Sequence, residues 1–168
     1  MIIVHINWYF FVDEIVILFN HRVYNTINNE GSQGKNFSFP RKDVIKVMKR
    51  TILIMGLPGS GKTTLAEKLV VKLNAAWFNA DAVRQDIYSE LGFSAEDRLK
   101  HAERMGKLCK WASMNGGYAV ADFVCPTKKT RDAFNADFVV WVNRIEKGRY
   151  EDTNKMFEAP ENYDIPLT

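Results

Sequence analysis

The segment from Gly56 to Thr63 has the residue types and spacing of a phosphate-binding loop: a glycine, four residues, then Gly-Lys-Thr. In such loops glycines let backbone N–H groups converge on phosphate oxygens, and the following helix start adds partial positive charge. Lys62 is expected to reach the β- and γ-phosphates of ATP, and the Thr63 hydroxyl to hold Mg²⁺. The residues expected to contact ATP here are Gly56, Pro58, Gly59, Ser60, Gly61, Lys62, Thr63 and Thr64.

Two carboxylates follow apolar segments farther along the chain, Asp81 after 76–80 and Asp122 at the end of 118–122. In open α/β sheets ligands bind beyond the carboxyl ends of the strands, so both side chains are expected to face Lys62. Asp81 is predicted to orient or deprotonate an attacking hydroxyl, and Asp122 to hold Mg²⁺ through water. Lys62 and Asp81 are thus the predicted catalytic residues. Either carboxylate is alternatively a helix N-cap or an ordinary loop residue.

A basic cluster follows these carboxylates. It comprises Arg84, Arg98, His101 and Arg104. The last three are each three residues apart, so consecutive members lie next to each other on one side of a helix. Arginine forks suit a substrate that bears phosphate or sulfate. A solvated polar helix face is the alternative, and the same two interpretations apply to Lys128.

The elements that must position these residues alternate between strand and helix, which is typical of a parallel sheet covered on both faces. The predicted fold class is α/β, a P-loop NTPase-like three-layer sandwich with a parallel sheet of about five strands. Strands are expected over 51–55, 76–80, 118–122, 138–142 and 163–167. Helices are expected over 64–73 and 81–90, and from a Ser94–Asp97 capping box to a stop at 115–117. The stripe expected to be buried on that long helix is Leu99, Ala102, Met105, Cys109 and Ala112.

Residues 1–47 differ in composition from the kinase-like domain predicted over 48–168. Ile2 to Phe11 and Ile15 to Phe19 are consistent with a β-hairpin that packs on the main domain. The alternative is that Met48 is the natural start and that 1–47 is translated upstream sequence.

The whole chain has 168 residues, 46% of them hydrophobic and 26% charged, with a net charge of +3. These values are ordinary for one globular domain and fall short of a nucleic-acid binder. No apolar stretch reaches the roughly 20 residues of a membrane span, and no secretory signal is recognisable. The two cysteines have no metal or redox spacing. We expect a cytoplasmic protein that binds small anionic nucleotides, with neither nucleic acid nor membrane as partner.

Several segments together resemble the adenylyl-sulfate (APS) kinases. Asn79-Ala-Asp-Ala-Val-Arg84 is similar to the family's Asp-Gly-Asp-Asn-x-Arg, and Gly92-Phe-Ser-Ala-Glu-Asp-Arg98 to its Gly-Phe-Ser-x-Glu-Asp-Arg. The runs 123–126 and 157–162 resemble the family's Phe-Ile-Ser-Pro and Tyr-Glu-x-Pro segments.

The resemblance implies an ATP-dependent kinase that phosphorylates the 3′-hydroxyl of adenylyl sulfate, commonly as a homodimer. It implies that Phe93 stacks on the adenine and that Asp81 is the acid nearest the 3′-hydroxyl. The substrate contacts expected are Asp81, Arg84, Phe93, Arg98, His101, Arg104, Phe123 and Lys128, and the further ATP contacts are Arg144 and Ala159.

The chain departs from the family pattern at Asn79, Ala82, His101 and Cys125, where the family has Asp, Asn, Asn and Ser. Its lid is shortened to 144–156, and the family's final helix is absent. A kinase of another small hydroxyl compound, such as a nucleoside or sugar, is therefore an alternative. A non-catalytic nucleotide-binding module is a third.

Overall fold

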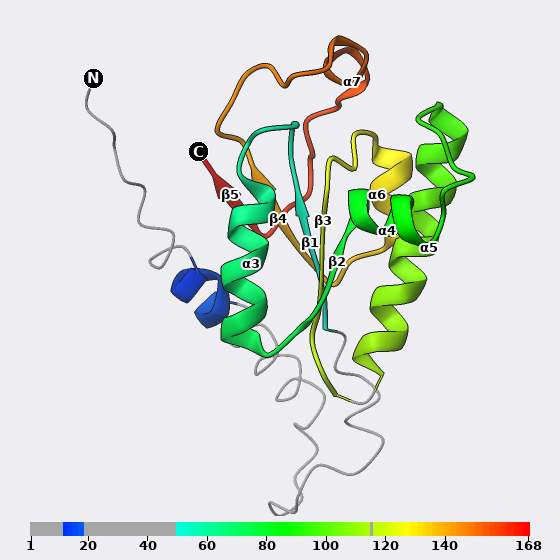
Figure 1. The fold of residues 1–168 in the computed structure, drawn as a ribbon. Coiled ribbons are helices and arrows are strands. Elements are labelled where there is room, and N and C mark those ends of the chain that lie inside the picture. Colours follow the sequence, from blue (N-terminus) through cyan, green and yellow to red (C-terminus); the bar gives the residue numbers. More distant parts are fainter. Residues whose placement is uncertain (1–11, 19–49, 115) are drawn as a thin grey trace, which may run out of the picture.

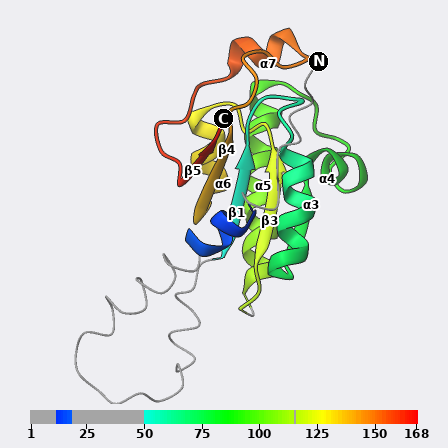
Figure 2. The ribbon, with the colours of Figure 1, turned by 90° about the vertical axis from the view of Figure 1, so that its left-hand side faces the viewer.

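The computed structural model describes residues 12–18, 50–114 and 116–168, which contain a five-stranded sheet of order β2-β3-β1-β4-β5. Every strand pair is parallel. The strands are β1 (Thr51–Met55), β2 (Ala76–Asn79), β3 (Ala119–Phe123), β4 (Phe138–Val142) and β5 (Ile165–Leu167). Figure 2 shows four of these strands side by side in the order β5, β4, β1 and β3. The predicted α/β fold with a parallel five-stranded sheet is confirmed.

The helices form two layers on the sheet, with one further helix beyond them (Figure 1). They are α3 (Lys62–Leu73), α4 (Ala80–Asp86), α5 (Ala95–Ser113), α6 (Lys128–Phe134) and α7 (Glu151–Met156). A helix over residues 12–18 and α3 cover one face, and α4, α5 and α6 cover the other. Helix α7 lies at the end of the sheet where β1 runs into the phosphate loop. Within the described ranges, none of the helices has the length and apolar character needed to cross a bilayer.

The central strand β1 supplies both hydrophobic cores because its side chains alternate between the two faces. Ile52 and Ile54 belong to the cluster with α3, whereas Leu53 and Met55 belong to the cluster with α5. All five residues of β1 are buried. This continuous apolar run is what a central parallel strand requires.

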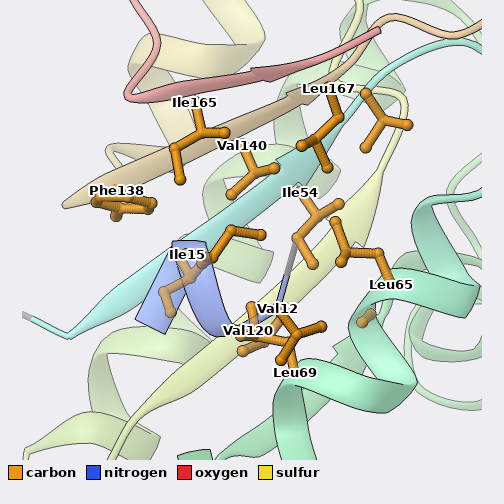
Figure 3. Packing of buried hydrophobic residues seen from close by; sticks show 13 residues of the cluster. Val12, Ile15, Ile54, Leu65, Leu69, Val120, Phe138, Val140, Ile165 and Leu167 are labelled. Carbon is orange, nitrogen blue, oxygen red and sulfur yellow. The ribbon is translucent and has the colours of Figure 1, made fainter. Parts of the chain in front are cut away.

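The N-terminal helix over residues 12–18 corrects the hairpin prediction, which placed a strand from Ile15 to Phe19. Val12 and Ile15 are buried and join the core cluster on the α3 side, and Val16 packs against it. Figure 3 shows Val12 and Ile15 among the side chains of Ile54, Leu69, Val120 and Val140. The i, i+3, i+4 spacing of the three apolar residues favours a helix with one buried face. The other predicted strand, Ile2 to Phe11, lies outside the described residues.

Helix α5 begins and ends where the sequence predicts, but its buried stripe is shifted. Ser94 is the N-cap and accepts a hydrogen bond from the Asp97 N–H at 3.1 Å. Leu99, predicted to be buried, is 37% exposed, whereas His101 is buried together with Ala102, Met105, Gly106 and Cys109. Gly106 is required there because a Cβ atom would lie 2.4 Å from the Phe134 carbonyl oxygen of α6.

Candidate functional site

The phosphate loop connects β1 to α3 with a backbone that requires its glycines. Gly56, Gly59 and Gly61 have φ angles of +147°, +91° and +101°. A Cβ atom on Gly56 would also lie 2.3 Å from the Val142 carbonyl oxygen. The Ser60 side chain is buried, and its Oγ has no hydrogen-bond partner among the described residues. The loop is therefore a cradle whose polar groups suit phosphate oxygens.

Lys62 is the first residue of α3 and is buried. Its ammonium donates a hydrogen bond to the Leu57 carbonyl oxygen at 2.9 Å, so the side chain curls back over its own loop. Burial lowers the pKa of Lys62 to about 8, although the charges of Asp122 and Asp81 act in the opposite direction. An anion bound beside Lys62 would therefore stabilise the charged form of its side chain.

Asp122 lies in β3 at the centre of a buried hydrogen-bond network. Thr63 Oγ1 donates to its Oδ2 at 2.8 Å, and Trp77 Nε1 donates to its Oδ1 at 2.8 Å. Asn79 Nδ2 donates to both oxygens, at 3.1 and 3.3 Å, because Asn79 and Asp122 are register partners in β2 and β3. Burial raises the pKa of Asp122, while these bonds and the Lys62 charge oppose the rise. The donors fix the carboxylate beside Thr63.

Thr63 and Asp122 present the oxygen ligands that Mg²⁺ prefers. The described residues contain no cluster of three His, Cys, Asp or Glu side chains that would form an all-protein metal cage. Mg²⁺ in phosphoryl-transfer sites is held by one or two protein oxygens together with substrate phosphates. The residues beside the loop fit that mode of binding.

Asp81 lies in the first turn of α4 and is exposed to solvent. The N-cap of this helix is Asn79, whose Oδ1 accepts from the Ala82 N–H at 3.0 Å, so the alternative that Asp81 is the cap does not hold. Burial lowers the pKa values of both Lys62 and Arg84, and the negative charge of Asp81 acts in the opposite direction on each of them. Asp81 therefore lies within electrostatic reach of both the phosphate loop and the basic cluster.

Three predicted substrate residues come together between α4 and α5. Phe93 is 62% exposed, and the guanidinium carbons of Arg84 and Arg98 lie 4.8 and 5.4 Å from its ring centroid. Arg84 also donates to the carbonyl oxygens of Leu91 and Gly92, and Arg98 Nε to that of Phe93 at 2.9 Å. An exposed ring close to two cations suits a ligand with an aromatic base and an anionic group.

Two other members of the basic cluster lie elsewhere. His101 is 1% exposed and sits in the core, so it is left out of the proposed substrate contacts. Arg104 pairs with Glu90 and lies 4.6 Å over the Tyr88 ring. These contacts fit the alternative that Arg104 lies on a solvated helix face better than they fit a substrate contact.

The remaining predicted substrate residues, Phe123 and Lys128, have structural partners. Phe123 ends β3 and packs on Phe134, with ring centroids 5.5 Å apart. Lys128 is exposed on α6 and pairs with Asp132 at 2.6 Å. Neither contact excludes a role in binding.

The other predicted ATP contacts lie outside the loop itself. Thr64 is exposed in the first turn of α3, and Arg144, two residues beyond β4, is partly buried. Ala159 is exposed next to Glu158, whose backbone carbonyl accepts from Arg131 at 2.9 Å.

The shortened lid, residues 144–156, forms a strap over the phosphate loop that the sequence analysis did not predict. A Cβ atom on Gly148 would lie 2.7 Å from Pro58 Cδ, and one on Gly59 would lie 3.8 Å from Arg149 Nε. Asn154 secures the strap by bonding the Gly148 backbone at both its N–H and its carbonyl. Helix α7 was missed although its acidic first turn is a usual sign of a helix start.

The strap is also tied to the basic cluster. Arg98 donates to the Asp152 carboxylate at 3.3 Å and to the buried Thr153 hydroxyl at 3.2 Å. The same short segment thus contacts the phosphate loop on one side and Arg98 of α5 on the other.

Comparisons with known proteins agree with this geometry. A probable adenylyl-sulfate kinase of Pseudomonas aeruginosa is 32% identical over 138 residues, which cover 66% of this chain and 64% of that protein. The chain therefore spans less than two thirds of that relative's length. An adenylyl-sulfate kinase of Clostridium kluyveri is 32% identical over 173 residues, covering 81% of this chain and 87% of that protein.

The fold is shared with a solved structure of the Mycobacterium tuberculosis APS kinase in complex with AMPPNP and APS. The TM-score is 0.59 at 20% identity, and the match covers 71% of this chain and 87% of that one. A family model described as adenylylsulphate kinase matches residues 48–144, more than half of the chain. The matched range contains the phosphate loop, Asp81, and Phe93 with its neighbours Arg84 and Arg98. The chain belongs to the adenylylsulphate kinase family.

Proposed function

We propose that this chain is an ATP-dependent kinase that transfers the γ-phosphoryl group to the 3′-hydroxyl of adenylyl sulfate. The products are 3′-phosphoadenylyl sulfate and ADP. One observation carries the proposal: the exposed Phe93 ring lies close to the guanidiniums of Arg84 and Arg98, and Asp81 lies within electrostatic reach of Arg84. An adenine ring, an anionic sulfate and an acceptor hydroxyl need these three kinds of group together.

The phosphate loop would hold the triphosphate of ATP, with Lys62 neutralising charge that develops on the β- and γ-phosphates. Mg²⁺ bound at Thr63 and Asp122 would supply further charge neutralisation when present. Arg149 of the strap lies over Gly59 and would add a positive charge beside the phosphates, although the shortened lid contains few basic residues. The strap would also exclude water from the transfer.

Asp81 would accept the proton of the 3′-hydroxyl as that oxygen attacks the γ-phosphorus. The new O–P bond forms in line with the breaking bond to the β-phosphate oxygen, and ADP leaves. Arg84 and Arg98 would orient the acceptor through its charged group, while Phe93 stacks on the base. This division of labour places the donor on the loop and the acceptor between α4 and α5.

The test is an ADP-release assay with ATP, Mg²⁺ and a panel of acceptors containing adenylyl sulfate, adenosine and simple sugars. Turnover with adenylyl sulfate alone supports the proposal, and turnover with another acceptor assigns the site to a different substrate. Binding of ATP without any turnover supports the non-catalytic module instead. Lys62→Ala is expected to lower kcat by about 10²–10³ without loss of fold. A fall of tenfold or less would contradict the proposed role of the loop.

We also propose a cytoplasmic location and a homodimer, both by resemblance to the family. Cys109 and Cys125 are unpaired and buried, which suits a reducing compartment. Light scattering of the purified protein distinguishes a dimer from a monomer of 19.3 kDa.

A further inference from the structure

The short turn that carries Asp81 is held by two side chains, one from Asn79, the N-cap of α4, and one from His101 of α5. On the C-terminal side of Asp81, the Ala82 N–H donates to Asn79 Oδ1 at 3.0 Å. On its N-terminal side, the Ala80 carbonyl oxygen lies 3.1 Å from His101 Nε2. Because a carbonyl oxygen only accepts hydrogen bonds, His101 Nε2 carries the proton. Both peptide groups next to Asp81 are thereby pinned.

The two side chains approach from opposite faces of the sheet. Asn79 ends β2 and donates its amide N–H to Asp122, on the face of the sheet where Thr63 lies in the first turn of α3. His101 comes from α5, whose buried residues share a cluster with Ala80. The turn is therefore braced between the metal-binding side and the α5 side of the molecule.

His101 is built to hold a fixed position and not to meet a ligand. Its ring packs edge-to-face against Tyr88 and Phe123, at centroid distances of 6.3 and 6.4 Å. Burial, together with the charges of Arg84 and Arg104, lowers the pKa of His101 to about 4. The imidazole is therefore neutral at physiological pH and keeps one N–H to donate.

We propose that Asn79 and His101 are positioning residues that together fix Asp81 relative to Asp122, Thr63 and the phosphate loop. The inference rests on the proposed function, in which Asp81 meets the acceptor hydroxyl. Asn79, Ala82 and His101, at which the sequence departs from the family pattern, all belong to this turn or to its supports.

The residue type at position 79 follows from the same geometry. The Asn79 amide nitrogen lies 3.1 Å from Asp122 Oδ2, and a carboxylate there would oppose the Asp122 charge. Asparagine donates to Asp122 and accepts from the Ala82 N–H. It therefore links Asp122 to the turn that carries Asp81 without adding a repelling charge. Displacing a reacting group by about 1 Å can cost on the order of 100-fold in rate, so loss of this link is expected to lower kcat.

The test uses variants that remove one contact each. Asn79→Ser keeps an oxygen for the Ala82 N–H but lacks the amide that reaches Asp122. His101→Phe keeps a ring between Tyr88 and Phe123 but lacks the donor, and His101→Gln restores an N–H at a similar place. Lys100→Gln, on the exposed side of α5, is the matched control.

We expect Asn79→Ser and His101→Phe to lower kcat by about 10- to 100-fold, with both KM values within about threefold of wild type. His101→Gln should recover most of the kcat, and the double variant should lose less than the product of the single losses. A rise in the acceptor KM alone would make His101 a substrate ligand and overturn the inference. A His101→Gln variant no better than His101→Phe would overturn it as well.

Hydrogen exchange of the ligand-free protein separates this inference from the proposed function. Amides of α4 should exchange at least about tenfold faster in His101→Phe, while β1 and α3 keep wild-type protection. Unchanged exchange in α4 would overturn the brace even if wild type phosphorylates adenylyl sulfate. Faster exchange would support the brace even if adenylyl sulfate proves not to be the acceptor.

Discussion

At the scale of single residues, the Lys62 ammonium makes nucleotide binding depend on pH. Burial lowers its pKa to about 8 in the free protein, and its hydrogen-bond acceptor there is a neutral carbonyl oxygen. A bound triphosphate would raise that pKa because an anion favours the charged form. Binding above pH 8 must therefore take up a proton.

We expect the affinity for Mg·AMPPNP to fall by up to about tenfold between pH 7 and pH 9, as the charged fraction of Lys62 falls. Calorimetry in buffers of different ionisation enthalpy measures both the affinity and the proton uptake. Lys62→Arg is the matched control because its guanidinium stays charged throughout this range. Equal pH dependence in both proteins would show that another group is responsible.

His101 makes the folded protein sensitive to acid. Its pKa is about 4 in the fold, against 6.5 as its ordinary value, because it is buried and faces Arg84 and Arg104. Below pH 6.5 His101 therefore binds a proton in the unfolded chain but not in the folded one. The free energy of unfolding falls as the pH drops from 6.5 to 4.

The free energy of unfolding should fall over that pH interval by about 3 kcal/mol more in wild type than in His101→Phe. Urea titrations at pH 7, 5.5 and 4 give the comparison, and protonation of carboxylates cancels between the two proteins. Parallel pH profiles would mean that His101 accepts its proton in the folded state.

The residues that the sequence could identify are those whose partners are close along the chain. The loop from Gly56 to Lys62 followed from one strand and one helix start. The hydrogen bonds that Asn79 donates to Asp122 depend on the register of β2 against β3, which no local sequence pattern reveals. The burial of His101 depends on how α5 docks on the sheet, and its polar side chain gave no sign of it.

At the scale of elements, the strands were predictable, whereas three helices were not: the helix over 12–18, α6 and α7. β1 and β4 have the predicted bounds, since continuous apolar runs indicate buried parallel strands. The helix over 12–18 was predicted as a strand because a short apolar run fits either period. Helix α7 has only six residues and little apolar character, so its position depends on Arg98 and Gly148 contacts that arise in the folded chain.

The strap links the donor and acceptor regions through one ion pair. Arg98 binds the Asp152 carboxylate, so an anionic acceptor bound to Arg98 as proposed would compete with Asp152 for the same guanidinium. Asp152→Asn removes this competitor. The KM for adenylyl sulfate should fall by up to about fivefold, the range expected for a pair with one exposed partner.

Glu151→Gln is the matched control for that change, because Glu151 is an exposed α7 carboxylate whose ion pair is with Lys155. Steady-state kinetics with both substrates gives the comparison. A rise in the KM for adenylyl sulfate in Asp152→Asn would mean that Asp152 orients Arg98 for binding and does not compete with the acceptor.

At the scale of the whole molecule, both faces of the sheet must be covered for a parallel sheet to be stable. One face has α4, α5 and α6, whereas the other has α3 and the helix over 12–18. Ile15 is 0% exposed and packs in the cluster that includes Phe138 and Ile165 (Figure 3). We therefore propose that this part of the N-terminal segment belongs to the core of the domain beginning near residue 48.

Ile15→Ala should lower the free energy of unfolding by about 2–5 kcal/mol, because it leaves a cavity under β4 and β5. Ile17→Ala, on the same helix but 66% exposed, should change it by no more than about 0.5 kcal/mol. Urea unfolding of both variants measures the difference, and a chain starting at Met48 should lose at least as much as Ile15→Ala. If that shorter chain is as stable as the full one, the helix over 12–18 contributes nothing to the fold. The alternative that residues 1–47 are upstream sequence would then be favoured.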